Sequence, residues 1–384
     1  MELTSLNPFM NKDNMTSKTS LLFKLQTSMP KVSFALSLLI ATLGILALLL
    51  FPYLVLTLPF DIYSAAMSAA ELKDWIDSAI LLIVLGLSGA FSWAIYTLRF
   101  SLPKGLDVSK EKFPHLSKLI DELSEEFGNP KIDRIIISHQ YEIKVVKTPQ
   151  AHTPFLNTST LIIGLPVLQT MSPLYFKALL ARRIGQLSTQ HSPVTTRLYF
   201  LNGIWQQFLK SCQRSKNIFA KTLGYFFRVY NSLYQTILTP WLQQQELEAD
   251  SYGMDIINDT DMVECLVYEE VVTKFLDNKF WPKIYHMAKR SKKPTYMPYS
   301  QITKVTKAGI TDDEISETIQ KALKQDNKYT SIMPTLPERL NQFGHSKPLP
   351  PKRLNKTAAS YYLGNSLEQI IAVFDKNWLK TLTK

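Results

Sequence analysis

The stretch from Val32 to Phe60 reads VSFALSLLIATLGILALLLFPYLVLTLPF and contains no charged residue. A helix needs about 20 apolar residues to cross the hydrocarbon layer of a bilayer, and this stretch exceeds that length. It is also too long for the apolar part of a secretory signal peptide, and no small-residue cleavage site is obvious after it. The stretch therefore predicts a membrane-spanning helix.

A second uncharged stretch, AILLIVLGLSGAFSWAIYTL from Ala79 to Leu98, predicts a return span. Lysines precede the first span, Arg99 and Lys104 follow the second, and acidic residues outnumber basic ones between the spans. The positive-inside rule then predicts that the N-terminus and the large C-terminal part are cytoplasmic. The predicted division is a cytoplasmic tail at residues 1–31, a transmembrane hairpin at 32–99 with spans at about 33–58 and 79–98, and one domain at 104–384.

The charge and the cysteines exclude several classes of protein. The net charge is +11, but the basic residues are scattered apart from a short run near Lys289, and no nucleic-acid motif accompanies them. We therefore expect membrane lipid, and no nucleic acid, to be the partner of this charge. Cys212 and Cys265 lack metal-ligand spacing, so they predict small buried residues in a reducing compartment rather than a disulfide or a cysteine-based zinc site.

The part after Pro103 reads as α+β and predominantly helical, with one small β-sheet. Apolar spacing, turn residues and the Ser172–Pro173 helix start carry this interpretation. A polar connection through Pro149, Pro154 and Asn157 separates the last two predicted strands. The predicted strands are 133–138, 142–147 and 160–164, and the predicted helices are 113–127, 173–188, a long aromatic-rich region at 194–229, 241–257 after Pro240, and 366–379.

Two segments carry a resemblance to a known family. They are LIIGLPVLQTMSPLYFKALLARRIGQLSTQHS, from Leu161 to Ser192, and QELEADSY, from Gln245 to Tyr252. Together they resemble the zinc metallopeptidase family of the heat-shock protease HtpX and the CAAX prenyl proteases, in its bacterial membrane-anchored subgroup. Leu276–Tyr285 and Leu336–Gly344 are similar to stretches of the same subgroup. The resemblance implies a zincin-like (gluzincin) domain after the transmembrane hairpin and a place in the bacterial inner membrane.

In that family one helix bears H-E-x-x-H and a later helix bears E-x-x-x-D. The first motif here reads Arg182-Arg183-Ile184-Gly185-Gln186, so the resemblance places Arg182, Gln186 and Glu246 at the metal-ligand positions, Arg183 at the general-base position and Asp250 in a supporting position. A guanidinium stays protonated, so it neither ligates a cation nor accepts a proton from water. No intact zinc site is therefore predicted, and zinc is expected only if the family activity is retained. A Thr-His-Pro element of the subgroup is also absent, since residues 332–334 read Ile-Met-Pro.

Burying Glu246 and Asp250 without a metal requires another cation, so we predict that Arg182 or Arg183 pairs with them. Other histidines offer little help in rebuilding a metal site. His191 lies nine residues after Arg182 and so points away from its face of a continuous helix, and nothing in the spacing directs His152 or His286 to the cleft.

Three functions stay open on these residues. The first is a pseudoprotease that binds or regulates proteins without hydrolysing them, with unfolded or membrane-protein segments as partners. In the family, extended segments bind by strand addition, and the predicted edge for this is Glu142, Ile143, Lys144, Val145, Val146 and Lys147. The second is a zinc metalloendopeptidase with unorthodox ligands. The third is a structural membrane adaptor whose cleft is filled by its own side chains.

Overall fold

The computed structural model describes residues 12–68, 71–150, 153–188, 193–290, 296–325, 331–345, 347–349 and 355–382 of the chain. The chain forms two compact units, and each is built from separate stretches of sequence. Unit 1 comprises Met1–Leu102, Lys147–Thr158 and Arg197–Trp241, and unit 2 comprises Pro103–Val146, Ser159–Thr196 and Leu242–Lys384.

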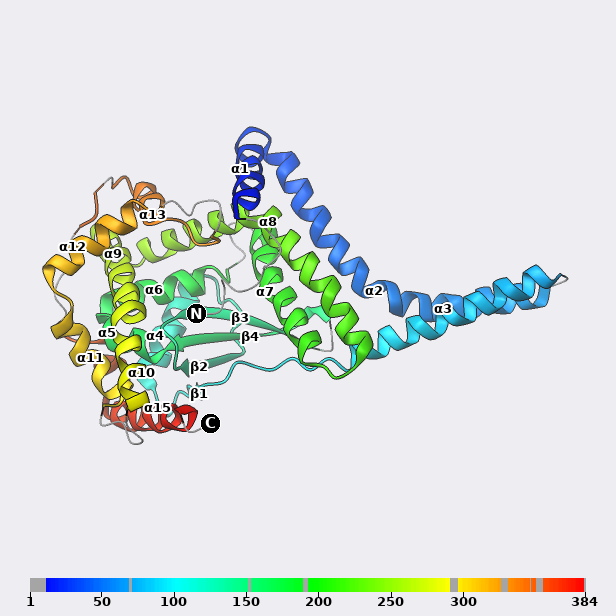
Figure 1. The fold of residues 1–384 in the computed structure, drawn as a ribbon. Coiled ribbons are helices and arrows are strands. Elements are labelled where there is room, and N and C mark those ends of the chain that lie inside the picture. Colours follow the sequence, from blue (N-terminus) through cyan, green and yellow to red (C-terminus); the bar gives the residue numbers. More distant parts are fainter. Residues whose placement is uncertain are drawn as a thin grey trace. The chain divides into compact units, whose positions relative to one another are not determined.

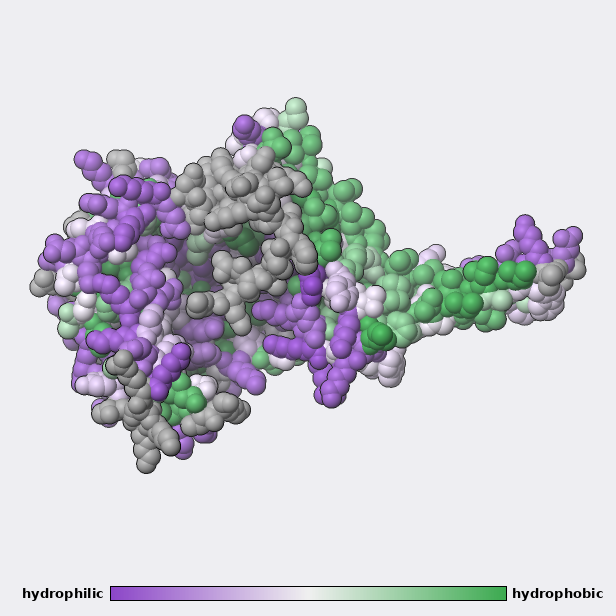
Figure 2. All heavy atoms as spheres, in the orientation of Figure 1, coloured by the Kyte–Doolittle hydropathy of each residue, from purple (hydrophilic) through white to green (hydrophobic). Residues whose placement is uncertain are grey.

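Unit 1 contains the two predicted spans as long helices. α1 (Lys12–Ser28) is followed by α2 (Pro30–Ser68) and α3 (Leu72–Tyr96), and the last two are long and apolar enough to cross a membrane. Only 28% and 22% of their most apolar windows are buried, unlike the core helices of a soluble protein. Figure 2 shows the hydrophobic surface that runs along them. The apolar stretches thus fold as two helices suited to association with a membrane.

Two further helices belong to unit 1, and the second of them packs on α2 and α3. They are α7 (Pro193–Arg214) and the part of α8 (Ile218–Met254) that ends at Trp241. Tyr230 Oη donates a hydrogen bond to the carbonyl of Ile40 in α2 at 2.8 Å, and Trp241 Nε1 donates to Ser33 Oγ at 3.1 Å. The side chains on the inner sides of α7 and α8 form a shared aromatic core, centred on Trp205.

The structure corrects the predicted break at Pro240. One helix, α8, runs through this residue, and the predicted helix from Trp241 is only its second part. A proline inside a helix costs about 3 kcal/mol. Leu238 and Leu242 on either side are buried, so the packing of both flanking turns outweighs that cost. The region predicted as helical at 194–229 is divided instead at residues 215–217, where α7 ends and α8 begins.

The sheet has four strands in the order β1-β2-β4-β3 (Figure 1). β1 (Leu106–Asp107) runs antiparallel to β2 (Arg134–Ser138), and β2 runs parallel to β4 (Thr153–Gly164), with Arg134 opposite Thr160 and Ser138 opposite Gly164. β3 (Ile143–Gln150) lies at the edge. The three predicted strands are therefore present in a mixed sheet, and the two-residue strand β1 was missed.

The predicted polar connection between the last two strands is wrong. β3 continues to Gln150 and β4 begins at Thr153, so Pro149, Pro154 and Asn157 lie in strands. Glu142 O accepts a hydrogen bond from Gly164 N at 2.7 Å. Backbone N–H and C=O groups of even-numbered residues in β3 therefore point toward β4, and those of odd-numbered residues point away from the sheet. Pro149 is at an outward position, where its missing N–H interrupts no bond to β4. The ladder between the strands thus tolerates residues that usually mark a loop.

The remaining helices of unit 2 pack with the sheet around a large apolar cluster, and a second apolar cluster includes Val263, Leu266 and Leu340. The predicted helix at 113–127 is present, with its apolar face buried at Leu116, Leu119, Ile120 and Leu123. The elements are α4 (Pro114–Glu126), α5 (Leu165–Thr170), α6 (Pro173–Gly185), α9 (Asp259–Phe275), a π-helical turn (Leu276–Phe280), α10 (Trp281–Arg290), α11 (Pro298–Gly309), α12 (Asp312–Leu323), α13 (Leu336–Gln342), α14 (Ala358–Tyr362), a 3₁₀ turn (Gly364–Ser366) and α15 (Leu367–Leu382).

A buried arginine–carboxylate cluster as the candidate functional site

Helix α6 starts where the sequence predicts and ends at Gly185, three residues before the predicted end at residue 188. Ser172 caps it by accepting a hydrogen bond from Tyr175 N at 3.1 Å, and Pro173 occupies the first turn. Near its other end a Cβ at Gly185 would lie 2.4 Å from Tyr252 Cγ in α8, so only glycine allows this approach. The contact brings the last turn of α6 against residues 246–250 of α8.

Arg182 lies at the centre of that contact and is 1% exposed. Its Nε is 2.6 Å from Asp250 Oδ1, its Nη1 is 3.2 Å from Glu269 Oε2, and its Nη2 is 3.7 Å from Glu246 Oε2. The Glu269 contact has hydrogen-bond geometry, whereas the other two are ion pairs without it. One guanidinium therefore faces three carboxylates.

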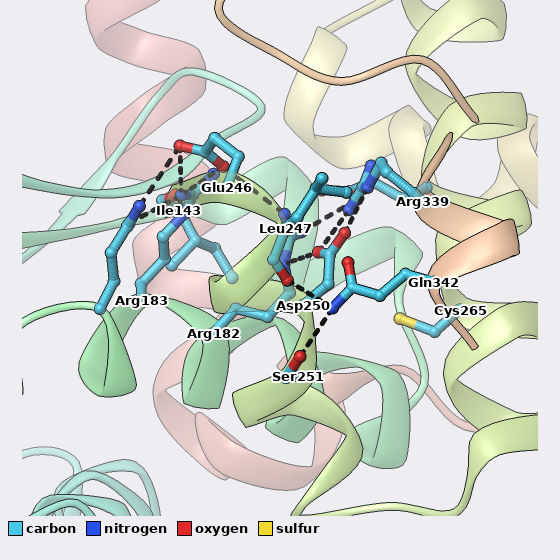
Figure 3. A network of polar contacts seen from close by, with 12 residues as sticks. Ile143, Arg182, Arg183, Glu246, Leu247, Asp250, Ser251, Cys265, Arg339 and Gln342 are labelled. Atoms are coloured by element: carbon cyan, nitrogen blue, oxygen red, sulfur yellow. Dashed lines mark hydrogen bonds and ion pairs between the residues drawn. The ribbon is translucent and has the colours of Figure 1, made fainter. Parts of the chain in front are cut away.

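Arg183 is a second guanidinium that binds the carboxylate of Glu246. Its Nη1 donates to both oxygens of Glu246 at 3.1 and 3.0 Å and to Gln186 Oε1 at 2.9 Å, and its Nε donates to the carbonyl of Ile143 in β3 at 2.9 Å (Figure 3). Gln186 completes the arrangement, because its Nε2 donates to Glu246 Oε1 at 3.4 Å. The residues at the predicted ligand positions are thus bonded to one another and to a guanidinium.

A third arginine, Arg339 in α13, completes the cluster. Its Nε and Nη2 donate to the two oxygens of Asp250 at 2.7 and 2.9 Å, a bidentate pair, and its Nη2 also reaches Glu269 Oε2 at 3.4 Å. Burial disfavours the charge on Arg339, but Asp250 first, and then Glu269 and Glu246, outweigh it and raise the pKa of the guanidinium. Gln342 holds α13 in place by donating to Leu247 O and Ser251 Oγ of α8.

The cluster balances its charges almost entirely out of contact with water. Three guanidinium groups face three carboxylates, and Glu269, with its side chain 25% exposed, is the most accessible of the six. Pairing at this depth is what buried ions require, since the cost of removing them from water must be offset by partners. The prediction that Arg182 or Arg183 pairs with Glu246 and Asp250 is confirmed for Arg182, and Arg183 pairs with Glu246 as well.

The residues present do not fit a zinc ion. Glu246 and Gln186 direct their oxygens at Arg183, and Arg182 Nη2 adds positive charge beside Glu246, so a cation here would meet guanidinium groups rather than lone pairs. Among the described residues, no three His, Cys, Asp or Glu side chains are grouped to hold a metal ion. His286 is exposed on α10, and His152 and His191 lie outside the described residues.

The space beside the cluster is small. A cavity of about 30 Å³, lined in part by Tyr141, Ile143, Leu179 and Arg183, has room for about one water molecule. The predicted edge strand is at the edge of the sheet, but Ile143 offers its outward carbonyl to Arg183, and Lys147 offers its carbonyl to Gln207 at 2.7 Å within unit 1. Two outward acceptors that an added strand would use are therefore occupied.

The sequence analysis does not identify two members of the cluster. Arg339 lies in LPERL, where the Thr335–Glu338 capping box explains the helix start but not the direction of the arginine. Glu269 is one of two consecutive glutamates on α9, and nothing in the spacing distinguishes it from a solvated residue. Cys265 lies next to the cluster, where burial and then Glu269 raise the pKa of its thiol. Both cysteines are buried and free, as predicted.

Comparisons of the chain with models of protein families, with curated proteins and with solved structures find no match.

Proposed function

We propose that this chain is a membrane-anchored, non-hydrolytic counterpart of the HtpX-like zinc metallopeptidases, which acts by binding or regulating other proteins. In this proposal α2 and α3 cross a bacterial inner membrane twice, and the N-terminus and unit 2 are cytoplasmic. The apolar length of the two helices supports anchorage. The basic residues that flank the pair and the acidic residues between them support the orientation.

The observation that carries the non-hydrolytic part is the position of Arg183. The resemblance assigns this position to the general base, yet the guanidinium there donates to the carboxylate of Glu246 and to Gln186. It cannot accept a proton from water, and it neutralises the acid that would be the third zinc ligand. Contacts of α6 with residues 246 and 250 of α8 agree with what the resemblance implies, so the proposal keeps the scaffold and replaces the metal with arginine.

A restoration experiment tests the resemblance. We expect the combined substitutions Arg182→His, Arg183→Glu and Gln186→His to yield a chain that binds one zinc ion, with Glu246 as the third ligand. Without metal, the carboxylates of Glu246, Asp250 and Glu269 in this variant have only Arg339 left of the three cluster arginines. Zinc would replace the lost positive charge, so the melting temperature of the variant should rise on adding zinc and fall again with chelator. Adding Glu246→Gln should remove that response. A folded variant indifferent to zinc would contradict the proposed site.

The unmodified chain provides the second measurement. We expect no stoichiometric zinc after purification and no chelator-sensitive cleavage of casein, an unfolded protein substrate. Zinc at one ion per chain together with such cleavage would instead support the metalloendopeptidase with unorthodox ligands. This measurement does not depend on whether the restored variant folds.

A structural membrane adaptor is a second candidate, because the cleft leaves about 30 Å³ and the edge carbonyl of Ile143 is occupied. A photocrosslinking residue at Lys144, whose side chain is partly exposed beside Glu142, separates the two. Crosslinks to unfolded segments or membrane-protein segments at this strand would support protein binding through the edge. Equal crosslinking from Lys118, on the exposed face of α4, would show that the edge has no special role.

A further inference from the structure

The α7–α8 region of unit 1 carries an unusual charge distribution. Between Pro193 and Trp241 the sequence has six basic residues and no acidic one. The six are Arg197, Lys210, Arg214, Lys216, Lys221 and Arg228. In unit 2, by contrast, the buried arginines are matched by carboxylates. This region therefore presents positive charge without acidic residues of its own, which favours an anionic partner over a cationic one.

The outward side of α8 exposes large apolar residues. Ile218 and Val229 are each 71% exposed, Tyr225 is 66% exposed, and Phe226 and Leu233 are also exposed. At about 100° per residue these five side chains fall on one stripe of the helix. A continuous apolar stripe on a helix surface marks a contact with lipid or protein rather than with water.

Basic side chains border this stripe. Lys221 and Arg228 are exposed and lie along one side of it, by the same helical spacing. The Arg228 guanidinium is 5.3 Å from the ring centroid of Tyr225, so an aromatic ring and a cation are presented together. Apolar residues, aromatic rings and adjacent lysine or arginine are typical of helices that lie in the headgroup region of an anionic bilayer.

Contacts within unit 1 bring α8 beside the two predicted spans. Tyr230 donates to Ile40 O, and a Cβ at Gly44 would lie 2.2 Å from Tyr230 Oη, so α8 touches α2 inside the predicted first span. Phe219 packs on Phe91 of α3 with ring centroids 5.2 Å apart. If α2 and α3 are in a bilayer, the outward stripe of α8 is carried to that same bilayer.

We propose that the outward face of α8, formed by Ile218, Tyr225, Phe226, Val229 and Leu233 with Lys221 and Arg228 beside it, binds an anionic lipid surface. The α7–α8 region then lies at the membrane surface and adds a third attachment to the two spans. The inference rests on the membrane anchorage proposed above. Lipid is favoured over a second protein because the stripe shares unit 1 with the spans and because the charges around it are all of one sign.

Environment-sensitive fluorophores on single introduced cysteines test this in the full-length chain. The chain is reconstituted in vesicles of phosphatidylcholine, with or without a third of phosphatidylglycerol. The label is placed at Val229→Cys on the stripe, at Leu56→Cys, an exposed position of α2, or at Lys118→Cys, an exposed position of α4 in unit 2. Cys212 and Cys265 are buried, and the wild-type chain treated with the same label corrects for their reaction.

We expect lipid-borne quenchers to quench the label at position 56 in both vesicles and the label at position 118 in neither. The label at 229 should be quenched more strongly when phosphatidylglycerol is present. Each basic residue near an anionic surface shifts the bound population by about fivefold. A triple variant with reversed charge at exposed positions should therefore lose the dependence of quenching at 229 on phosphatidylglycerol, while quenching at position 56 stays unchanged. The variant combines Lys216→Glu, Lys221→Glu and Arg228→Glu.

The outcomes distinguish this inference from the anchorage beneath it. Quenching at 56 but not at 229 overturns the lipid-binding face and leaves the two spans intact. Absence of quenching at 56 overturns the anchorage itself. A label at 229 that is shielded equally in both vesicles, in a chain that crosslinks to a second copy through that position, assigns the face to a protein partner and also overturns the inference.

Discussion

The buried cluster of unit 2 and the outward face of α8 in unit 1 treat the same side chain in opposite ways. Arg182 is 1% exposed and faces three carboxylates, whereas Arg228 is exposed and lies beside a tyrosine ring on a helix face without acids. Burial demands a counter-charge within the protein, since an unpaired buried ion costs several kcal/mol by order of magnitude. An exposed arginine is solvated and carries no such demand.

The difference separates two uses of positive charge. In the cluster, arginine holds α6, α8, α9 and α13 together through Asp250, Glu246 and Glu269, so its contribution is to folding. On α8, the charges contribute to whatever approaches from outside. Net charge alone does not show this distinction, because the three arginines and three carboxylates of the cluster cancel and contribute nothing to the net +11. The substitutions below test it.

The largest effect is expected from Arg182→Met. The substitution keeps an unbranched apolar side chain but removes the guanidinium, which leaves Asp250, Glu246 and Glu269 with less positive charge in a buried site, at an expected cost of about 3–5 kcal/mol in the free energy of unfolding. Chemical denaturation measures it, with Arg228→Met as the matched control, for which we expect no measurable change. Equal stability of both variants would remove the distinction between the two regions.

Arg339→Lys tests geometry rather than charge. Lysine keeps the positive charge but cannot form the two parallel hydrogen bonds that Arg339 donates to Asp250. We expect a loss of about 1–3 kcal/mol in the same denaturation experiment. The companion change Arg228→Lys on the exposed face should leave stability unchanged. A fully stable Arg339→Lys protein would mean that charge neutrality, without the fork, is sufficient for the cluster.

Arg183→Met should have a smaller effect of about 1–2 kcal/mol. Its side chain is 12% exposed, so water can replace part of its contacts, and Arg182 still lies near Glu246. The substitution also frees the carbonyl of Ile143 at the edge strand. If the edge binds extended segments, crosslinking from Lys144 should increase in this variant. A decrease would show that Arg183 helps binding rather than blocking the edge.

Much of the fold and four of the six charged residues of the cluster could be predicted from the sequence, for identifiable reasons. The spans, the three strands and the Ser172 cap depend on local patterns of a few residues, which a sequence displays directly. Arg182 with Asp250 could be predicted because each lies at a position that the resemblance assigns to one site. Arg339 and Glu269 reach the cluster through tertiary packing of α13 and α9, which leaves no periodic signal.

The errors have the same origin. Pro240 predicts a helix boundary and Pro149 predicts a loop, yet both lie inside regular elements. Packing around Leu238 and Leu242 holds α8 together, and the outward position of Pro149 removes its penalty. The sequence also predicts the apolar stripe of α8 only as part of an aromatic-rich helical region. Which residues of that helix face outward depends on its contacts with α2, and the sequence of α8 alone does not contain them.

Asp375 provides the smallest predicted effect and an intermediate case between the two regions. Its carboxylate caps the start of α11 by accepting hydrogen bonds from Tyr299 N at 2.9 Å and Ser300 N at 3.2 Å, and it also accepts one from the hydroxyl of Ser300. Burial raises its pKa above the ordinary 3.8, and the hydrogen bonds from Ser300 and Tyr299 offset this only in part. Asp250, by contrast, is matched by two guanidinium groups.

A raised pKa means that the folded state holds the proton of Asp375 more tightly than the unfolded chain does. Its contribution to stability is therefore complete below pH 3.8 and falls as the pH rises through the folded-state value. The variant Asp375→Asn lacks this titration, so the stability of the wild-type chain relative to the variant should decline between about pH 4 and pH 7. Denaturation of both proteins across that range measures it. A relative stability that rises with pH would mean that Asp375 behaves like the paired acids of the cluster, and hydrogen bonds from amides and a hydroxyl would then suffice to hold a buried charge.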